Sequence, residues 1–412
     1  MVTLAPGASW HGSALLNRLV GELSPGEYRI RGSFAFQGKT VSSPEQPVRV
    51  RSLEPKSVHV GQGLRPLDAA EGRAVALTKA GTLSTLVAFN FHEARPEVGE
   101  IETMPPITQF NAGPEATDVS TVWRNTPVFS ELIQWTAWRE GREIKAISDA
   151  STSPDSLTLP VVPTHVVRPL LQFRGEPLEV LVTGKDQQLY LAVFPVDLDP
   201  KSKPRVAWHA QLPAIPDAIL AAPAPAGNNS RHIAFVVGGG DGVTVYHSSY
   251  MSGGHVGTFQ SSHISDATLV KSVPAAMMVD SKGDAHITVL VTAKDGKSYS
   301  AVEVKFKNSG AAAGSPAVLS LGSLDESVTG GAVLYVEKAG ELQKRDIAVL
   351  TQSPERGMGT GSILRRWMAN SHAWKVFPPR VTPVDPVILV PGESFSYVLC
   401  FAPSQGFFFE PL

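Results

Sequence analysis

A short apolar strand, a tight turn bearing Gly or Asp, and a second apolar strand recur seven times along this chain of 412 residues. Clear copies are LEVLVTGKDQQLYLAVF from Leu178 and ITVLVTAKDGKSYSAVEV from Ile287. The period is roughly 50 to 55 residues, which leaves room for two further strands in each unit. The turns centre near Ala80, Gly141, Asp186, Asp241, Asp295, Ala339 and Gln405. Because such a small sheet cannot bury both of its faces alone, the pattern predicts an all-β protein whose units pack against one another.

Two stretches, DSKGDAHITVLVTAKDGKSYS from Asp280 and GEPLEVLVTGKDQQLYLAVF from Gly175, resemble repeats of β-propellers. The resemblance covers about residues 51–412 and is to a style of repeat. The Trp-Asp pair of WD40 blades, the paired glycines of kelch blades and the Asp box of sialidases are absent from the sequence, so no specific family and no catalytic residue is implied. We expect a seven-bladed propeller, with six or eight blades as alternatives because the intervals between the turns are uneven.

The last repeat supplies only three obvious strands. The fourth strand of that blade is expected from the stretch Val48–Val60, so that strands from both ends of the propeller close the ring and remove an open edge. The ring prediction fails if the first and last repeats do not touch.

Residues 1–50 differ from the rest and are expected to form a separate small domain, with the propeller over 51–412. Tyr28, Ile30, Phe34 and Phe36 approximate the two-residue alternation of a half-buried strand. The phrase LSPGEYRIR resembles the last strands of a small immunoglobulin-like sandwich. Such a sandwich needs about 100 residues. We therefore expect a reduced β-sandwich-like segment docked on the propeller.

Composition excludes several classes of function. The net charge of −2 argues against nucleic-acid binding, which needs a concentrated basic surface. The single cysteine, Cys400, allows no intramolecular disulfide. No apolar stretch approaches the roughly 20 residues that span a bilayer, and no signal peptide is visible, so we expect no membrane insertion and a cytoplasmic location by default. The oligomeric state is left open.

One group of residues is the best candidate for binding. Trp123, Trp135 and Trp138 cluster with Arg139 in the second repeat, and exposed tryptophans stack on sugar rings or anchor protein partners. Packing between blades is the more usual role of such tryptophans.

Other groups of polar residues have ordinary explanations. His247, His255 and His263 are eight residues apart, which is not a spacing diagnostic of a metal site. Asp280, Asp284 and Asp295 lie beside glycines and suit turns better than a calcium loop. We therefore expect no metal, no cofactor and no catalytic residues.

Three functions remain open. The first is a non-enzymatic binding or scaffold protein that presents loops of one propeller face to a protein or glycan. The second is a saccharide-directed hydrolase or lyase with its site at the propeller channel. It requires several members of one set to converge, namely His92, Glu93, His247, His286 and Asp295. The third is a structural subunit of a larger assembly.

Overall fold

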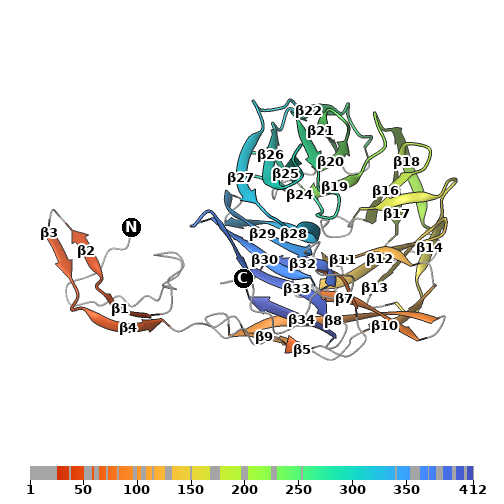
Figure 1. Cartoon of the computed structure of the whole chain (residues 1–412). Coiled ribbons are helices and arrows are strands. Elements are labelled where there is room, and N and C mark those ends of the chain that lie inside the picture. The colour runs from red at the N-terminus through yellow and green to blue at the C-terminus, as the bar shows by residue number, and fades with distance from the viewer. Residues whose placement is uncertain are drawn as a thin grey trace.

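The protein is an all-β chain built as a β-propeller with an N-terminal hairpin (Figure 1). The computed structural model describes residues 26–36, 39–50, 58–59, 65–70, 73–80, 83–95, 100–103, 108–113, 116–125, 132–148, 151–167, 177–195, 203–223, 230–251, 254–338, 341–352, 362–369, 371–376, 384–391, 396–402 and 406–411. Within these ranges every regular element is a strand, and no helix has the length and apolar character needed to cross a bilayer.

Six antiparallel sheets are each made of strands that are consecutive in sequence. The first contains β6 (Arg65–Ala70), β7 (Arg73–Ala80), β8 (Leu83–Arg95), β9 (Glu100–Thr103) and β10 (Thr108–Ala112). The second contains β11 (Thr117–Asn125), β12 (Leu132–Glu140), β13 (Glu143–Ser148) and β14 (Asp155–Thr158). The third contains β15 (Pro163–Val166), β16 (Leu178–Gly184), β17 (Gln188–Phe194) and β18 (Arg205–Gln211).

The remaining three sheets of this kind follow the same order. The fourth contains β19 (Ala218–Pro223), β20 (Ser230–Gly238), β21 (Gly242–Met251) and β22 (Gln260–Ser265). The fifth contains β23 (Ala267–Leu269), β24 (Ala276–Val279), β25 (Ala285–Ala293), β26 (Ser298–Phe306) and β27 (Ala317–Ser323). The sixth contains β28 (Ser327–Lys338), β29 (Glu341–Gln352), β30 (Ile363–Met368) and β31 (Ala373–Val376).

A further sheet, called the closing sheet below, joins the two ends of the propeller. It contains β32 (Val384–Pro391), β33 (Ser396–Ala402), β34 (Gly406–Pro411) and β5 (Val58–His59), with Phe409 paired to Val58. The predicted exchange of a strand between the two ends is therefore confirmed. The expectation of seven blades is corrected: the propeller has six blades of consecutive strands in the described residues, and the last hairpin unit belongs to the closing sheet.

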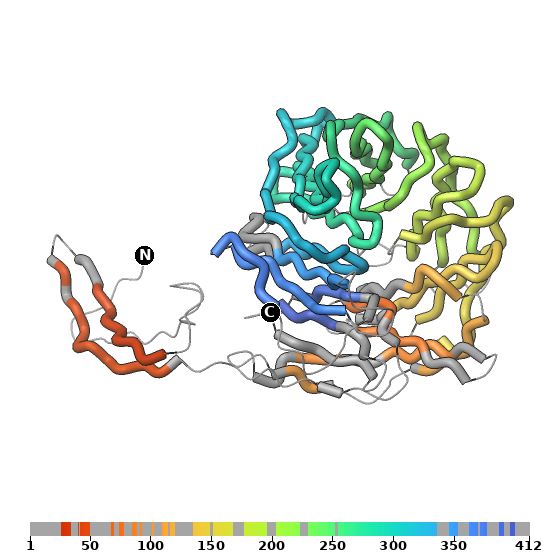
Figure 2. The backbone as a smooth tube through the Cα atoms, viewed as in Figure 1, coloured from red at the N-terminus to blue at the C-terminus, as the bar shows by residue number. Residues whose placement is uncertain are grey.

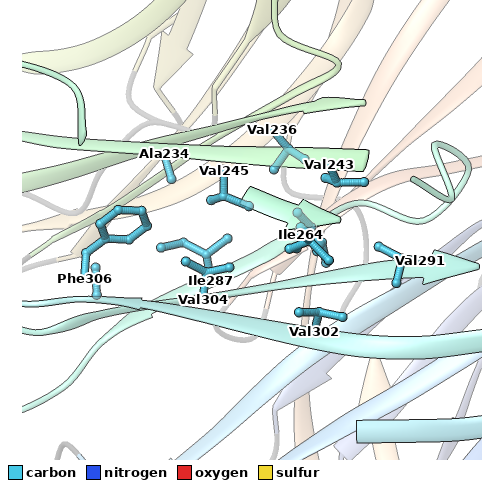
Figure 3. Close-up of a cluster of buried hydrophobic side chains, with 13 residues drawn as sticks. Ala234, Val236, Val243, Val245, Ile264, Ile287, Val291, Val302, Val304 and Phe306 are labelled. Carbon is cyan, nitrogen blue, oxygen red and sulfur yellow. The ribbon is translucent and has the colours of Figure 1, made fainter. Parts of the chain in front are cut away.

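The core lies between the sheets. Strands β16 and β17 are buried along almost their whole length because neighbouring sheets cover both of their faces, which explains their nearly continuous apolar sequence. A hydrophobic cluster fills each junction around the ring, including the one where Val390 and Tyr397 of the closing sheet meet Ala74 of the first sheet. The first and last repeats therefore touch, as the ring prediction requires. Figure 3 shows the junction between the fourth and fifth sheets, where Val245 and Ile264 face Ile287 and Val304.

The predicted turns mark one end of the propeller, called the turn end below. Counted in hydrogen-bonding order from the first strand, six of the seven lie between the second and third strands of a sheet. In the described turns, Gly141 and Gln187 have the positive φ values of 59° and 61° that tight turns require. Ala339 lies outside the described residues, and the strands that flank it are the first and second of the sixth sheet. The sixth repeat was therefore read out of phase, which accounts for part of the uneven spacing.

The N-terminal segment differs from the expected sandwich. Strand β1 (Gly26–Ile30) pairs with β4 (Gln46–Val50), and β2 (Ser33–Phe36) pairs with β3 (Lys39–Ser42), so the four strands form one long hairpin (Figure 2). No side chain described in this hairpin is buried. A sandwich is not confirmed, because the two ladders follow each other along one ribbon and do not face each other as two sheets.

Candidate functional site

Ionisable side chains from four neighbouring sheets gather near the propeller axis at the turn end. The first strands of several neighbouring sheets contact one another, among them β6 with β11, β11 with β15 and β28 with β32. The group, called the axial cluster below, lies at the beginnings of first strands, at the end of β12 and in the connections beside them. It consists of Asp118, Arg139, His165, Asp217 and Lys271.

An irregularity in β11 aims Asp118 at Arg139. The pairing of β11 with β12 shifts register between Thr117 and Ser120, and Asp118 within this bulge has a φ of 51°. Asp tolerates this left-handed conformation better than most residues, and bulges redirect side chains near functional sites. Arg139 Nε donates to Asp118 Oδ2 at 3.0 Å, and another guanidinium nitrogen donates to the Pro163 carbonyl at 2.8 Å. Arg139 thus links the second sheet to the third.

His165 lies on β15, the first strand of the third sheet, and is half-buried. Its Nδ1 is 3.3 Å from Thr183 Oγ1, which is 2.7 Å from Thr164 Oγ1. Burial lowers the pKa of His165, the Asp118 and Asp217 charges act in the opposite direction, and Arg139 lowers it further. His165 is therefore neutral at pH 7.

Asp217 and Lys271 bridge the fourth and fifth sheets. Lys271 Nζ donates to Asp217 Oδ1 at 2.6 Å, and the Gly238 amide donates to Asp217 Oδ2 at 2.8 Å. Burial acts to raise the pKa of Asp217, but these two hydrogen bonds outweigh it and hold the pKa below its ordinary value. The lysine side chain is 67% exposed and the aspartate 22%, so the carboxylate is the fixed member of the pair.

The structure separates the residues of the predicted tryptophan site. Trp135 and Trp138 are 3% and 0% exposed and face opposite sides of β12. Trp135 packs in the junction with the third sheet, whereas Trp138 packs in the junction with the first and stacks on Phe110. Trp123 is on β11, and its side chain lies outside the described residues. Of the four residues, Arg139 is the one that belongs to the axial cluster, and a binding role for the four stays a prediction.

The other polar residues singled out in the sequence have separate partners. His247 contacts His232, His263 contacts Thr244, and His255 packs near Trp208. Among the described residues no group of three or more His, Cys, Asp or Glu side chains is arranged to hold a metal ion. Asp280 and Asp295 accept backbone amides two to four residues ahead, which is the turn chemistry expected of them.

The set required for saccharide chemistry does not converge. His92 contacts Glu102, and His247 contacts His232. His286 contacts Asp280 and Glu303, whereas Asp295 contacts Ser298. The Glu93 side chain lies outside the described residues.

Sequence reasoning missed four members of the axial cluster. Asp118, His165, Asp217 and Lys271 are far apart in sequence and follow no motif. One weak signal was present, because Asp217 lies in the proline-rich connection LPAIPDAIL that precedes a first strand. Such connections lie at strand ends.

Comparisons with known proteins show no family. No family model matches the chain, and no curated protein matches it. Among solved structures, the chain is similar to BBS1N in its complex with ARL6DN, with 15% identity, 88% of this chain and 98% of that chain covered, and a TM-score of 0.43. The Myceliophteria thermophila Cps50 (Swd1) β-propeller domain gives 10% identity, coverage of 86% and 98%, and a TM-score of 0.41. The fucose-specific lectin from Aleuria aurantia gives 11%, coverage of 71% and 96%, and a TM-score of 0.37. These likenesses are too distant to carry an inference about function.

Proposed function

We propose that this chain is a non-enzymatic binding or scaffold protein that presents the turn end of its propeller to a protein partner. One observation carries the proposal: five chargeable side chains from four sheets gather near the axis on a rigid frame. Sites on packed strands hold their geometry better than sites on loops. The side chains of both ion pairs are partly exposed, so a partner can reach them, and charge at an interface gives orientation and specificity.

A protein partner is favoured over a glycan. Sugar recognition commonly uses exposed aromatic rings, but Trp135 and Trp138 are committed to packing between sheets. The polar side chains of the axial cluster suit the charged and polar groups of a polypeptide. The division into a segment over 1–50 and a propeller over 51–412 is part of the same proposal.

Arrays of peptides and glycans, probed with the labelled full chain and with two variants, test this function. Arg139→Ala removes the link between the second and third sheets at the turn end. Lys307→Ala removes an exposed lysine after β26, at the opposite end of the fifth sheet. We expect peptides bound by the wild type to lose at least about tenfold in affinity with Arg139→Ala and to be unaffected by Lys307→Ala. Ligands that are glycans alone, or equal binding by all three proteins, would reject the proposal.

A second candidate, a subunit of a larger assembly, is favoured by the N-terminal hairpin. A two-stranded ribbon is marginally stable in water by itself. Tyr28 and Val48 are cross-strand partners and are half-buried at most. Removal of residues 1–50 followed by analytical ultracentrifugation tests this candidate. A wild-type oligomer that becomes a folded monomer supports it. The same oligomeric state before and after the removal rejects it.

A further inference from the structure

One outer strand of the propeller, β27, presents an open edge at the rim of the fifth sheet (Figure 1). Within the described residues it pairs with β26 alone, so its other edge directs backbone N–H and C=O groups outward. The pairing with β26 is regular over residues 317–320. A bulge at Leu321, followed by Gly322 with a φ of 72°, ends the regular part. The open edge therefore offers residues 317–320 to a further strand.

The other outer strands of the blades are protected by charged or polar side chains. A charge on an edge strand disfavours pairing with another chain. β10 exposes Gln109 and Asn111. The strands β14, β18, β22 and β31 each carry an ionisable residue, namely Asp155, Arg205 with His209, His263 and Lys375. β27 carries none, and its exposed positions are Ala317, Val318, Ser320, Gly322 and Ser323.

Apolar side chains are exposed on both sides of this edge. Val318 is 66% exposed and Val376, at the end of β31, is 43% exposed, and β27 contacts β31. Leu319 packs with Trp374 against the cluster between the fifth and sixth sheets, so Val318 stands on the opposite face of β27. A strand added to β27 would cover Val318 on one face and lie beside the sixth sheet on the other.

Charge favours a second copy of this chain as the added strand. A strand without charge suits an equally uncharged strand, and β27 itself is one. Antiparallel pairing about a twofold axis brings identical residues together, and like charges that face each other destabilise a sheet. The same pairing of β31 would bring Lys375 close to its own copy, whereas β27 opposes no charges. Opposite residues of such a pair share a face, so the two Val318 side chains lie on one face of the joined sheet.

We propose that β27 is a self-association edge, at which two copies of the chain pair their β27 strands antiparallel and join the two fifth sheets. The contact lies at the rim of the propeller and is separate from the axial cluster. Because the paired segment is short, the interface is smaller than that of a permanent dimer, and a dissociation constant in the micromolar range follows. At chain concentrations below that constant, the pair adds little to the unfolding free energy.

Sedimentation equilibrium of the full chain, from about 1 to about 200 µM, tests the inference. Val318→Lys places a charge on each strand near the twofold axis and removes the apolar contact. Met251→Lys is the matched control, because Met251 is 54% exposed at the end of β21 in the fourth sheet. Both sites are exposed, so both variants should fold, and urea unfolding verifies this.

Cross-linking gives a second readout that does not depend on the strength of association. Val318→Cys and Met251→Cys are treated with a short bismaleimide, and the wild type controls for the native Cys400. We expect a covalent dimer from Val318→Cys alone. In sedimentation, Val318→Lys should weaken the dimer about tenfold or more, and Met251→Lys should stay within about twofold of wild type.

Three outcomes would overturn the inference. The first is a wild type that stays monomeric at every concentration. The second is equal weakening by Val318→Lys and Met251→Lys, which would indicate general charge repulsion. The third is a dimer that Val318→Lys leaves intact and that removal of residues 1–50 abolishes, because the hairpin would then hold the contact. The peptide and glycan arrays judge the proposed function separately.

Discussion

Buried histidines on opposite sides of the fifth sheet differ in charge: one side holds a neutral pair and the other a protonated ring. On one side, His232 and His247 are each 1% exposed, with His232 Nδ1 3.1 Å from His247 Nε2 and the His247 ring stacked on Phe306. On the other side, His286 is 8% exposed and lies between Asp280 and Glu303. The degree of burial is similar. The partners therefore decide the charge.

The physical causes can be separated. Burial lowers the pKa of His232 to about 4 and that of His247 to about 3, and the His232 ring also disfavours a charge on His247. The hydrogen bond with Glu303 raises the pKa of His286 against the effect of burial, and Asp280 adds to it. Both nitrogens of His286 are within 3.2 Å of carboxylate oxygens, so only the doubly protonated ring donates to both.

Acidification has the largest expected effect on stability, because it acts on the side of the fifth sheet where His232 and His247 are neutral. Between pH 6.5 and about 4, unfolded chains protonate His232 and His247 while the folded protein does not, so stability falls as the pH falls. Each histidine contributes a slope of about 1.4 kcal/mol per pH unit in this window. Urea unfolding of the wild type and of the double variant His232→Gln/His247→Gln at several pH values measures it. The variant should have the shallower slope, and equal slopes would show that these rings do not titrate as described.

Truncation of Phe306, whose ring stacks on His247, has the next largest expected effect on stability. Phe306 is fully buried, and Phe306→Ala should cost about 3 to 5 kcal/mol of unfolding free energy because it leaves a cavity between the fourth and fifth sheets. Water that enters the cavity should also move the pKa of His247 up toward its ordinary value.

The matched control for that cavity is Val318→Ala. Val318 is 66% exposed on β27, so its truncation should change stability by less than about 0.5 kcal/mol. Denaturant titration measures both losses, and histidine NMR follows the pKa of His247. A loss below about 1 kcal/mol for Phe306→Ala, or an unchanged His247, would contradict the packing described here.

The sequence predicts this sheet better than it predicts its histidines. The apolar strands around Ile287 and Val304 and the turn at Asp295 follow from local pattern and turn chemistry, and the structure places them as expected. The pattern also suggests a propeller, because small sheets must cover one another. His232, His247 and His286 all read as polar interruptions of strands. Whether such a residue meets a carboxylate or another imidazole depends on side chains 6 to 17 positions away and on register, which composition does not reveal.

The axial cluster was missed for a related reason. Its members come from the beginnings of first strands, the end of β12 and the connections beside them, and they meet only after the sheets have packed. The hairpin around Ala339, which the sequence pattern places out of phase, shows that local pattern does not determine the position of a strand in its sheet. The turn near Ala339 has the local chemistry of the other turns, yet the sixth sheet uses its flanking strands as the first and second.

Neutralising one carboxylate beside His286 tests whether this ring is charged, and it is expected to cause the smallest loss of unfolding free energy. Glu303→Gln keeps the shape and removes a charge-assisted hydrogen bond, so we expect a loss of about 1 to 3 kcal/mol at pH 6. His286 contributes its stability as a cation below about pH 6.5, and this contribution is lost as the pH rises through its raised folded pKa. The difference between wild type and Glu303→Gln should therefore shrink toward pH 9. Glu143→Gln, in a half-exposed pair with Lys145, is the matched control and should cost about 0.5 kcal/mol or less at every pH. A Glu303→Gln penalty that is constant with pH would mean that His286 is neutral, and that the two sides of the fifth sheet do not differ in charge.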